Sequence, residues 1–160
     1  MYAFEPVPGQ PKAELYDDLI SAAKALVADE PDAVANMANV AAVLWQFLPD
    51  LNWAGFYRAL DGGLVLGPFI GKPACIRIAA GAGVCGAALV SRETQLVADV
   101  HAFPGHIACD AASRSELVVP VVRDGGVLAV IDLDSPLPAR FDAEDAAGIE
   151  RLAAALANKI

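Results

Sequence analysis

The chain has 160 residues, of which 56% are hydrophobic and 19% charged, and its formal net charge is −9. This length and composition predict one globular domain over residues 1–160 and exclude disordered and fibrous proteins. The negative charge argues against nucleic acids and anionic membranes as partners, because both attract positively charged surfaces. The sequence has no apolar run long enough to span a membrane and no signal-peptide pattern at its start, so we expect a cytoplasmic protein.

Two amphipathic helices are predicted in the first third of the chain. Apolar residues recur every three or four positions over about 12–29 and again over 34–48. A strand over 52–58 and a second over 64–70 follow, and the glycines between them indicate a tight turn. We interpret the helices as scaffold and the two strands as the first hairpin of a sheet.

Strand alternation places Trp53, Gly55 and Tyr57 on the same face of the first strand. The two aromatic rings could form the walls of a slot for a small ligand, with the glycine leaving the floor of the slot open. Packing of both rings in an ordinary hydrophobic core is the alternative, and from these residues alone it is the favoured one.

A glycine-rich segment over 81–86 precedes a predicted helix that runs to Ser91. Its G-x-G-x-x-G spacing matches a dinucleotide-binding fingerprint, but the surrounding sequence lacks repeated strand–helix–strand units, and we reject this interpretation. Cys85 lies near the start of the helix, where the positive backbone potential favours a thiolate. A small buried cysteine without a chemical role fits the position equally well. Residues 95–100 are then expected to be extended.

A second hairpin and a closing helix complete the predicted elements. Strands over 117–123 and 127–133 flank Asp124-Gly125-Gly126, which is a strong hairpin signal. Pro120 indicates an edge or a bulge in the first of these strands. Asp142 is placed to cap a last amphipathic helix. The order of helices and strands predicts an α+β fold, with an antiparallel sheet flanked by helices.

The segment 99–116 has neither a helical nor a strand period, yet it concentrates reactive side chains. It contains His101, His106 and Cys109 among several charged residues, and such loops on a rigid scaffold usually carry function. Because the chain has three cysteines and no signal peptide, we expect free thiols, metal ligands or redox-active groups. A metal site formed by the two histidines, Cys109 and another cysteine is a weaker hypothesis, since the spacing differs from that of compact zinc motifs.

Three carboxylates are expected at the open end of the second hairpin. A three-residue turn at 124–126 places Glu116 opposite Asp134, and a two-residue turn shifts this register by one position. Asp132 shares a strand face with Asp134, at the end of an apolar stripe. Such crowding should raise at least one carboxyl pKa. The alternative is that these acids cap loops, pair with Arg114 or lie in solvent.

The same end of the hairpin is expected to receive a thiol, because Cys109 precedes Glu116 by seven residues. A cluster of acids disfavours a permanent thiolate, since like charges repel. It suits a reaction in which sulfur attacks while a neighbouring acid protonates a leaving oxygen. Reduction of a sulfur–oxygen bond requires this combination together with a second thiol.

With these residues in view, the chain resembles the free methionine-(R)-sulfoxide reductases, which are stand-alone GAF-domain enzymes. The resemblance covers most of the chain and is carried by Asn52-Trp-Ala-Gly-Phe-Tyr57, Leu66-Gly-Pro-Phe-Ile-Gly-Lys-Pro-Ala-Cys75, Gly83-Val-Cys-Gly86, Asp99-Val-His-Ala-Phe-Pro-Gly-His-Ile-Ala-Cys-Asp110, Ser113-Arg-Ser-Glu116 and Asp132-Leu-Asp-Ser135. It implies a GAF fold, with a six-stranded antiparallel sheet, helices on both sides and assembly as a homodimer. It also implies reduction of free L-methionine (R)-sulfoxide and not of the protein-bound residue.

The resemblance assigns roles to particular residues. Cys109 resembles the nucleophile of the family and Cys75 its resolving thiol, with Cys85 accessory. The remaining site residues implied are the acids and aromatic walls of the active site, namely Glu116, Asp132, Asp134, Trp53 and Tyr57.

The mechanism implied begins with a protonated carboxyl that polarises the sulfoxide oxygen. Cys109 attacks the sulfur, methionine leaves, and the resulting sulfenic acid condenses with Cys75 to a disulfide. We expect thioredoxin or a similar dithiol as the external reductant, with no bound cofactor and no metal. A non-catalytic GAF sensor of a small ligand or of redox state is the alternative function, although a plain sensor does not need three cysteines.

Overall fold

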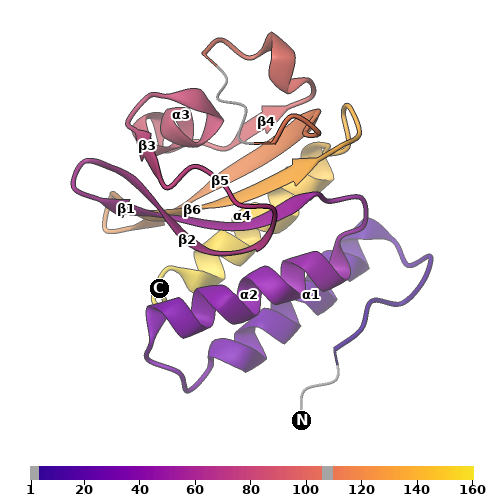
Figure 1. Cartoon of the computed structure of the whole chain (residues 1–160). Helices are drawn as coiled ribbons and strands as arrows, with labels where there is room; N and C mark the ends of the chain where they lie inside the picture. The colour runs from indigo at the N-terminus through magenta and orange to yellow at the C-terminus, as the bar shows by residue number, and fades with distance from the viewer. Residues whose placement is uncertain (1–3, 106–109) are drawn as a thin grey trace.

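The computed structural model describes residues 4–105 and 110–160, which form one antiparallel sheet with helices on both faces (Figure 1). The helices are α1 (Lys12–Val27), α2 (Ala33–Phe47), α3 (Gly83–Ser91) and α4 (Ala143–Leu156), with a short 3₁₀ turn η1 (Val100–Ala102). The strands are β1 (Trp53–Leu60), β2 (Gly63–Gly71), β3 (Arg77–Ala79), β4 (Gln95–Val97), β5 (Ser115–Arg123) and β6 (Gly126–Ser135). Their order across the sheet is β3-β2-β1-β6-β5-β4, which confirms the predicted α+β class with a six-stranded sheet.

The two faces of the sheet are covered unequally. Figure 1 shows α1, α2 and α4 against one face and α3 against the other. The main core packs Leu19, Leu44 and Leu152 of the three helices against sheet residues such as Ile131. A smaller cluster joins Val130 of the sheet to α3. The pocket described below lies on this second face, beside the nine-residue α3.

Carboxylate caps define where two of the helices begin. Asp32 accepts a hydrogen bond from the backbone N–H of Ala35 (2.8 Å) at the start of α2. Asp142 caps α4 as predicted, and Asp145 completes a reciprocal capping box. Within the described residues, no helix combines the length and apolar character needed to cross a membrane.

A buried ionic cluster ties α1 to the start of α4. Asp145 is 1% exposed and accepts hydrogen bonds from the Tyr16 hydroxyl (2.8 Å) and from Lys12 Nζ (2.7 Å). Arg140 adds a third contact at 3.4 Å. Since a buried carboxylate without partners is costly, these donors allow Asp145 to lie inside the protein.

The β5–β6 hairpin sets the register of the acidic residues. Its two-residue turn at 124–125 has positive φ at both positions (51° and 78°), as the favoured hairpin turns require. A bulge between Val121 and Val122 then restores the register expected for a longer turn, so Glu116 pairs with Asp134. The predicted pairing is therefore confirmed, with a shorter turn and one bulge in place of a three-residue turn.

Two predictions around β4 have different outcomes. β4 pairs with β5 only along 116–118, so Pro120 lies where β5 has no strand neighbour on that side, as predicted for an edge. Of the stretch predicted to be extended over 95–100, the strand covers Gln95–Val97, Asp99 is extended, and Val100 already belongs to the turn η1. Asp99 accepts a hydrogen bond from the backbone N–H of His101 (3.0 Å), which starts the turn η1.

The close packing of α4 on α1 leads to a first prediction. A Cβ added to Gly148 would lie 2.3–2.6 Å from ring atoms of the buried Tyr16. We expect Gly148→Ala to lower the free energy of unfolding by about 1–3 kcal/mol through overpacking, although alanine is the better helix former by about 1 kcal/mol. Urea unfolding measures the change.

The exposed neighbour Ala147 supplies the control for this prediction. Ala147→Gly should lower the free energy of unfolding by about 0.5–1 kcal/mol, because glycine only weakens the helix there. A Gly148→Ala protein more stable than wild type would contradict the packing argument.

Candidate active site

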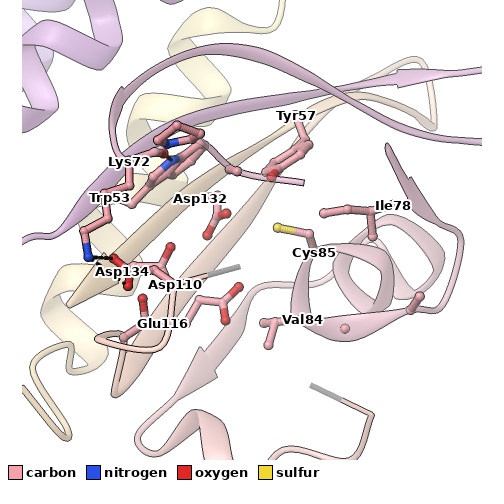
Figure 2. Close-up of a pocket in the computed structure, with 15 residues that line it drawn as sticks. Trp53, Tyr57, Lys72, Ile78, Val84, Cys85, Asp110, Glu116, Asp132 and Asp134 are labelled. Carbon is pink, nitrogen blue, oxygen red and sulfur yellow. Dashed lines mark hydrogen bonds and ion pairs between the residues drawn. The ribbon is translucent and has the colours of Figure 1, made fainter. Parts of the chain in front are cut away.

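A pocket opens on the α3 face of the sheet (Figure 2). Its lining comes from β1, β5 and β6, from the first turn of α3, from the β2–β3 connection and from the segment before β5. It brings together most of the site residues predicted from the sequence, namely Trp53, Tyr57, Cys85, Glu116, Asp132 and Asp134.

The three acidic residues are held close together by the strand register. Glu116 pairs with Asp134 across the hairpin, and Asp132 lies two residues away on the same face of β6. Glu116 and Asp132 are each 6% exposed. Burial raises the pKa of all three carboxyls, to about 7 for Asp132, and negative neighbours raise those of Glu116 and Asp134 further. The predicted upward shift of at least one carboxyl pKa is therefore found at each acid.

The protons of this cluster are not shared equally. Burial raises the pKa of Glu116 well above its usual range, and the charges of Asp132 and Asp134 add to this effect. A hydrogen bond between the Glu116 and Asp132 side chains raises the pKa of Glu116 and lowers that of Asp132. These directions favour ionisation of Asp132 before Glu116, an order that keeps Glu116 as a neutral hydrogen-bond donor. Oδ1 of Asp132 is buried without a hydrogen-bond partner in the described part of the chain, so an acceptor remains for a bound group.

Aromatic residues form one wall of the pocket. Trp53 stacks on Tyr57 with ring centroids 5.7 Å apart, and on Phe69 of β2 at 5.1 Å. The expectation that Gly55 leaves an open floor is wrong, because a Cβ there would lie 2.4 Å from the Cβ of Phe69. The space is filled by β2, which approaches β1 closely at a register shift. Trp53 and Tyr57 are buried in the core and also line the pocket. Core packing and a wall of the pocket, the two interpretations given for these rings, are therefore compatible.

Cys85 is a free, buried thiol in the first turn of α3, and its side chain points toward Asp132 in Figure 2. The prediction that the helix N-terminus favours a thiolate is wrong. Burial raises the pKa of this thiol, and the charges of Asp132 and Glu116 raise it further. These effects outweigh a helix-end potential of about 1 kcal/mol or less. Ligand atoms of these three residues lie within 4.8 Å of one another, so a metal ion could bind there by displacing their protons.

The metal site predicted from the sequence involves other residues. His101 is exposed on η1 and lies 3.0 Å from Asp99, away from the residues that line the pocket. His106 and Cys109 lie outside the described residues. His101 is thus the one predicted loop ligand that the structure describes, and it does not line the pocket.

Comparison with known proteins identifies the family. The model of the GAF domain family matches residues 34–160. The free methionine-R-sulfoxide reductase of Escherichia coli is 50% identical over 145 residues, which cover 91% of this chain and 88% of that protein. The enzyme of the same name from Saccharomyces cerevisiae is 42% identical over 89% of this chain and 83% of its own length. The chain belongs to the free methionine-R-sulfoxide reductase family.

A solved structure of the family agrees with the fold. The X-ray structure of free methionine-R-sulfoxide reductase from Neisseria meningitidis in complex with its substrate has a TM-score of 0.95 and 44% sequence identity to this chain. The match covers 99% of this chain and 95% of the other. The predicted GAF fold is thus confirmed over nearly the whole molecule.

The cysteines of this reductase-family chain occupy different surroundings. Cys75 lies half-buried in the β2–β3 connection and packs against the core on the α3 face. Asp110 and Ser113 line the pocket. The chain therefore reaches the pocket one residue after Cys109, the predicted nucleophile.

Sequence reasoning missed the polar residues that join these parts. The Asn52 side-chain amide donates hydrogen bonds to Asp110 (3.2 Å) and Ser113 (2.9 Å). Lys72 forms an ion pair with Asp110 (3.1 Å). All four residues fall within motifs that carry the family resemblance, and this was the available signal for them.

The buried acids make stability depend on pH. The pKa of Asp132 is about 7 in the folded protein and about 3.9 in an unfolded chain. Between these values the folded state binds more protons, so the contribution of Asp132 to stability falls as pH rises from about 4 to about 7 and stays low above. We expect Asp132→Asn to be more stable than wild type in urea unfolding at pH 8, with a smaller difference at pH 5.

Asp124, exposed in the β5–β6 turn, supplies the matched control. Asp124→Asn should differ little from wild type at either pH, because asparagine tolerates the same turn conformation. A stability difference for Asp132→Asn that does not change with pH would contradict the raised pKa.

Proposed function

We propose that this protein reduces free methionine (R)-sulfoxide to methionine, the activity that names its E. coli and yeast relatives. The observation that carries the proposal is the Glu116 carboxyl, buried beside Asp132 in the pocket. Burial and the neighbouring acids raise the pKa of this carboxyl, which favours its neutral form. A protonated acid near neutral pH can hydrogen-bond a sulfoxide oxygen and then give it a proton, which an ionised carboxylate cannot do. A sensor that only binds a ligand has no need of such a costly buried acid, which favours the reductase over the sensor hypothesis.

The pocket offers partners for both charged groups of a free amino acid. Among the described residues, no side chain caps α3, and the start of this helix lines the pocket. We therefore place the substrate carboxylate at the N–H groups of its first turn. We place the substrate ammonium beside Asp134. Burial raises the pKa of this carboxyl and Ser113 partly offsets the rise, so a bound cation would hold the group ionised. The S-methyl group of the substrate lies against Trp53 or Tyr57. This contact would allow the pocket to select the R epimer of the sulfoxide over the S epimer. Protein-bound methionine sulfoxide lacks both charges, so these contacts select the free amino acid.

The chemical step requires Cys109 as nucleophile. Its thiolate attacks the sulfoxide sulfur while Glu116 donates a proton to the oxygen. The sulfur–oxygen bond of the substrate breaks, the hydroxyl is transferred to the cysteine sulfur, and methionine leaves. Two electrons pass from the cysteine to the sulfoxide, and Cys109 becomes a sulfenic acid.

Cys75 and an external reductant complete the cycle. The Cys75 thiol attacks the sulfenic acid, a disulfide forms and water leaves. Thioredoxin or a similar dithiol then reduces the disulfide by exchange, so the cycle needs no bound cofactor. Cys85, as a neutral thiol beside the acids, has an accessory place in this scheme. A homodimer in the cytoplasm, where such dithiols are kept reduced, is part of the same proposal.

A thioredoxin-coupled assay with both free sulfoxide epimers tests the assigned cysteines and acid. Wild type should reduce only the R epimer, and Cys109→Ser should be inactive. Cys75→Ser should release methionine in the first turnover and then slow. Glu116→Gln should lower kcat by about 10²-fold or more.

The exposed Glu144 supplies a matched control, since Glu144→Gln should keep wild-type activity. Full activity in Cys109→Ser would overturn the assignment of the nucleophile, and full activity in Glu116→Gln that of the proton donor.

Blocked substrates test the recognition of the free amino acid. N-acetylation removes the ammonium charge and should lower kcat/KM by about tenfold or more, as expected for a lost hydrogen bond to a charged group. Asp134→Asn should lower kcat/KM for the free substrate and have little effect on the N-acetylated one. Equal losses on both substrates would show that Asp134 does not bind the ammonium group.

A further inference from the structure

An ion pair joins the two segments that carry the proposed catalytic cysteines. Lys72 lies in the β2–β3 connection three residues before Cys75, and Asp110 directly follows Cys109. Lys72 Nζ lies 3.1 Å from one carboxylate oxygen of Asp110 and 3.2 Å from the other. Figure 2 shows this contact at the edge of the pocket. Cys75 is disulfide-bonded in the structure, so the ion pair is seen in the state that the proposed resolving step produces. Two segments that are distant in the sequence meet beside the acids in that state.

Further contacts fix both partners of the ion pair. The backbone carbonyl of Lys72 accepts a hydrogen bond from the Trp53 indole N–H (3.2 Å). The preceding Gly71 packs directly on this ring, since a Cβ there would lie 2.6 Å from Cδ1 of Trp53. Asp110 accepts a hydrogen bond from the backbone N–H of Ala112 (2.9 Å). Lys72 and Asp110 are thus each held in place by contacts other than the ion pair.

Asn52 connects the ion pair to the acid cluster. Asn52 directly precedes β1. Its side-chain amide donates hydrogen bonds to Asp110 and to Ser113, both of which line the pocket. Ser113 in turn lies close enough to Asp134 to lower the pKa of that carboxyl. A continuous chain of polar contacts therefore runs from Lys72 at the rim to the acids of the pocket.

We propose that the Lys72–Asp110 ion pair is a positioning device for the resolving step of the proposed reductase cycle, on which this inference rests. It holds the connection that carries Cys75 against the segment that follows Cys109. In that step the Cys75 thiol attacks the sulfenic sulfur, a sulfur–sulfur bond forms, the sulfur–oxygen bond breaks, and the thiol proton leaves with the oxygen as water. Holding two reacting segments together raises their effective concentration and so the rate.

Solvent exposure limits the size of the effect. The side chain of Lys72 is 69% exposed and that of Asp110 is 14% exposed. Partly exposed ion pairs contribute modestly and are screened by salt. Loss of the pair should therefore slow disulfide formation and not abolish it.

Single-turnover measurements on the reduced, full-length protein separate the two steps. One equivalent of free methionine (R)-sulfoxide starts the reaction, methionine formed reports the first step, and loss of dimedone-reactive sulfenic acid reports the second. We expect Lys72→Met to lower the ratio of the second rate to the first about two- to fivefold, and Lys72→Arg to restore it. Lys24→Met removes an exposed lysine from α1, on the other side of the sheet, and should leave the ratio unchanged.

Two further readouts separate positioning by charge from a general structural role. Salt should slow disulfide formation in wild type toward the Lys72→Met rate and leave that variant unaffected. In a double-mutant cycle, Asp110→Asn should add little to the effect of Lys72→Met, because either change removes the same pair. Urea unfolding midpoints confirm that the variants are folded.

The inference is overturned if Lys72→Met forms the disulfide at the wild-type rate, or if salt slows wild type and variant equally. Failure of the proposed function has a different signature, since wild type would then form no methionine in the first step. The inference would fall with it.

Discussion

The burial of three carboxyl groups on one face of the β5–β6 hairpin is the constraint on which the site depends. Removing ionised carboxylates from water is costly, and here the cost is met by retaining protons near neutral pH. The bulge at 121–122 and the short turn set the pairing that brings Glu116 and Asp134 together. A shift of one position would turn one strand's acids toward the other face, against the main core. The chemistry of the pocket therefore begins with a backbone register.

Much of the scaffold was predictable because its signals are local. The helical periods over 12–29 and 34–48 and the Asp142 cap depend on residues a few positions apart, and the structure follows them closely. The pairing of Glu116 with Asp134 was also within reach, since turn length relates two adjacent strands. The end of the extended stretch over 95–100 could not be predicted in this way. The Asp99 carboxylate accepts a hydrogen bond from the backbone N–H of His101 and starts the turn η1.

The features that sequence reasoning missed arise where distant segments meet. Gly55 looked like an open floor, yet Phe69 from the neighbouring strand fills the space, and only the register shift in that pair reveals it. Cys85 was placed correctly at a helix start, but the pKa of its thiol is raised by burial and by acids on the strands β5 and β6. The role of Asn52 could not be predicted for the same reason, because its hydrogen bonds reach Asp110 and Ser113, which are distant in the sequence. Local pattern identifies residue types, whereas their chemistry depends on tertiary neighbours.

The division of the interior into two separate clusters has a consequence for protein engineering. Helices α1, α2 and α4 bury their apolar stripes on the side of the sheet opposite the pocket. Cavity-filling or helix-strengthening changes in that layer can raise thermal tolerance without altering any group that faces the ligand. The layer next to α3 has no such freedom, because its aromatic and sulfur-containing side chains are at once packing and pocket surface. Substitutions that change thermal stability and substitutions that change the pocket can therefore be made on opposite sides of one sheet.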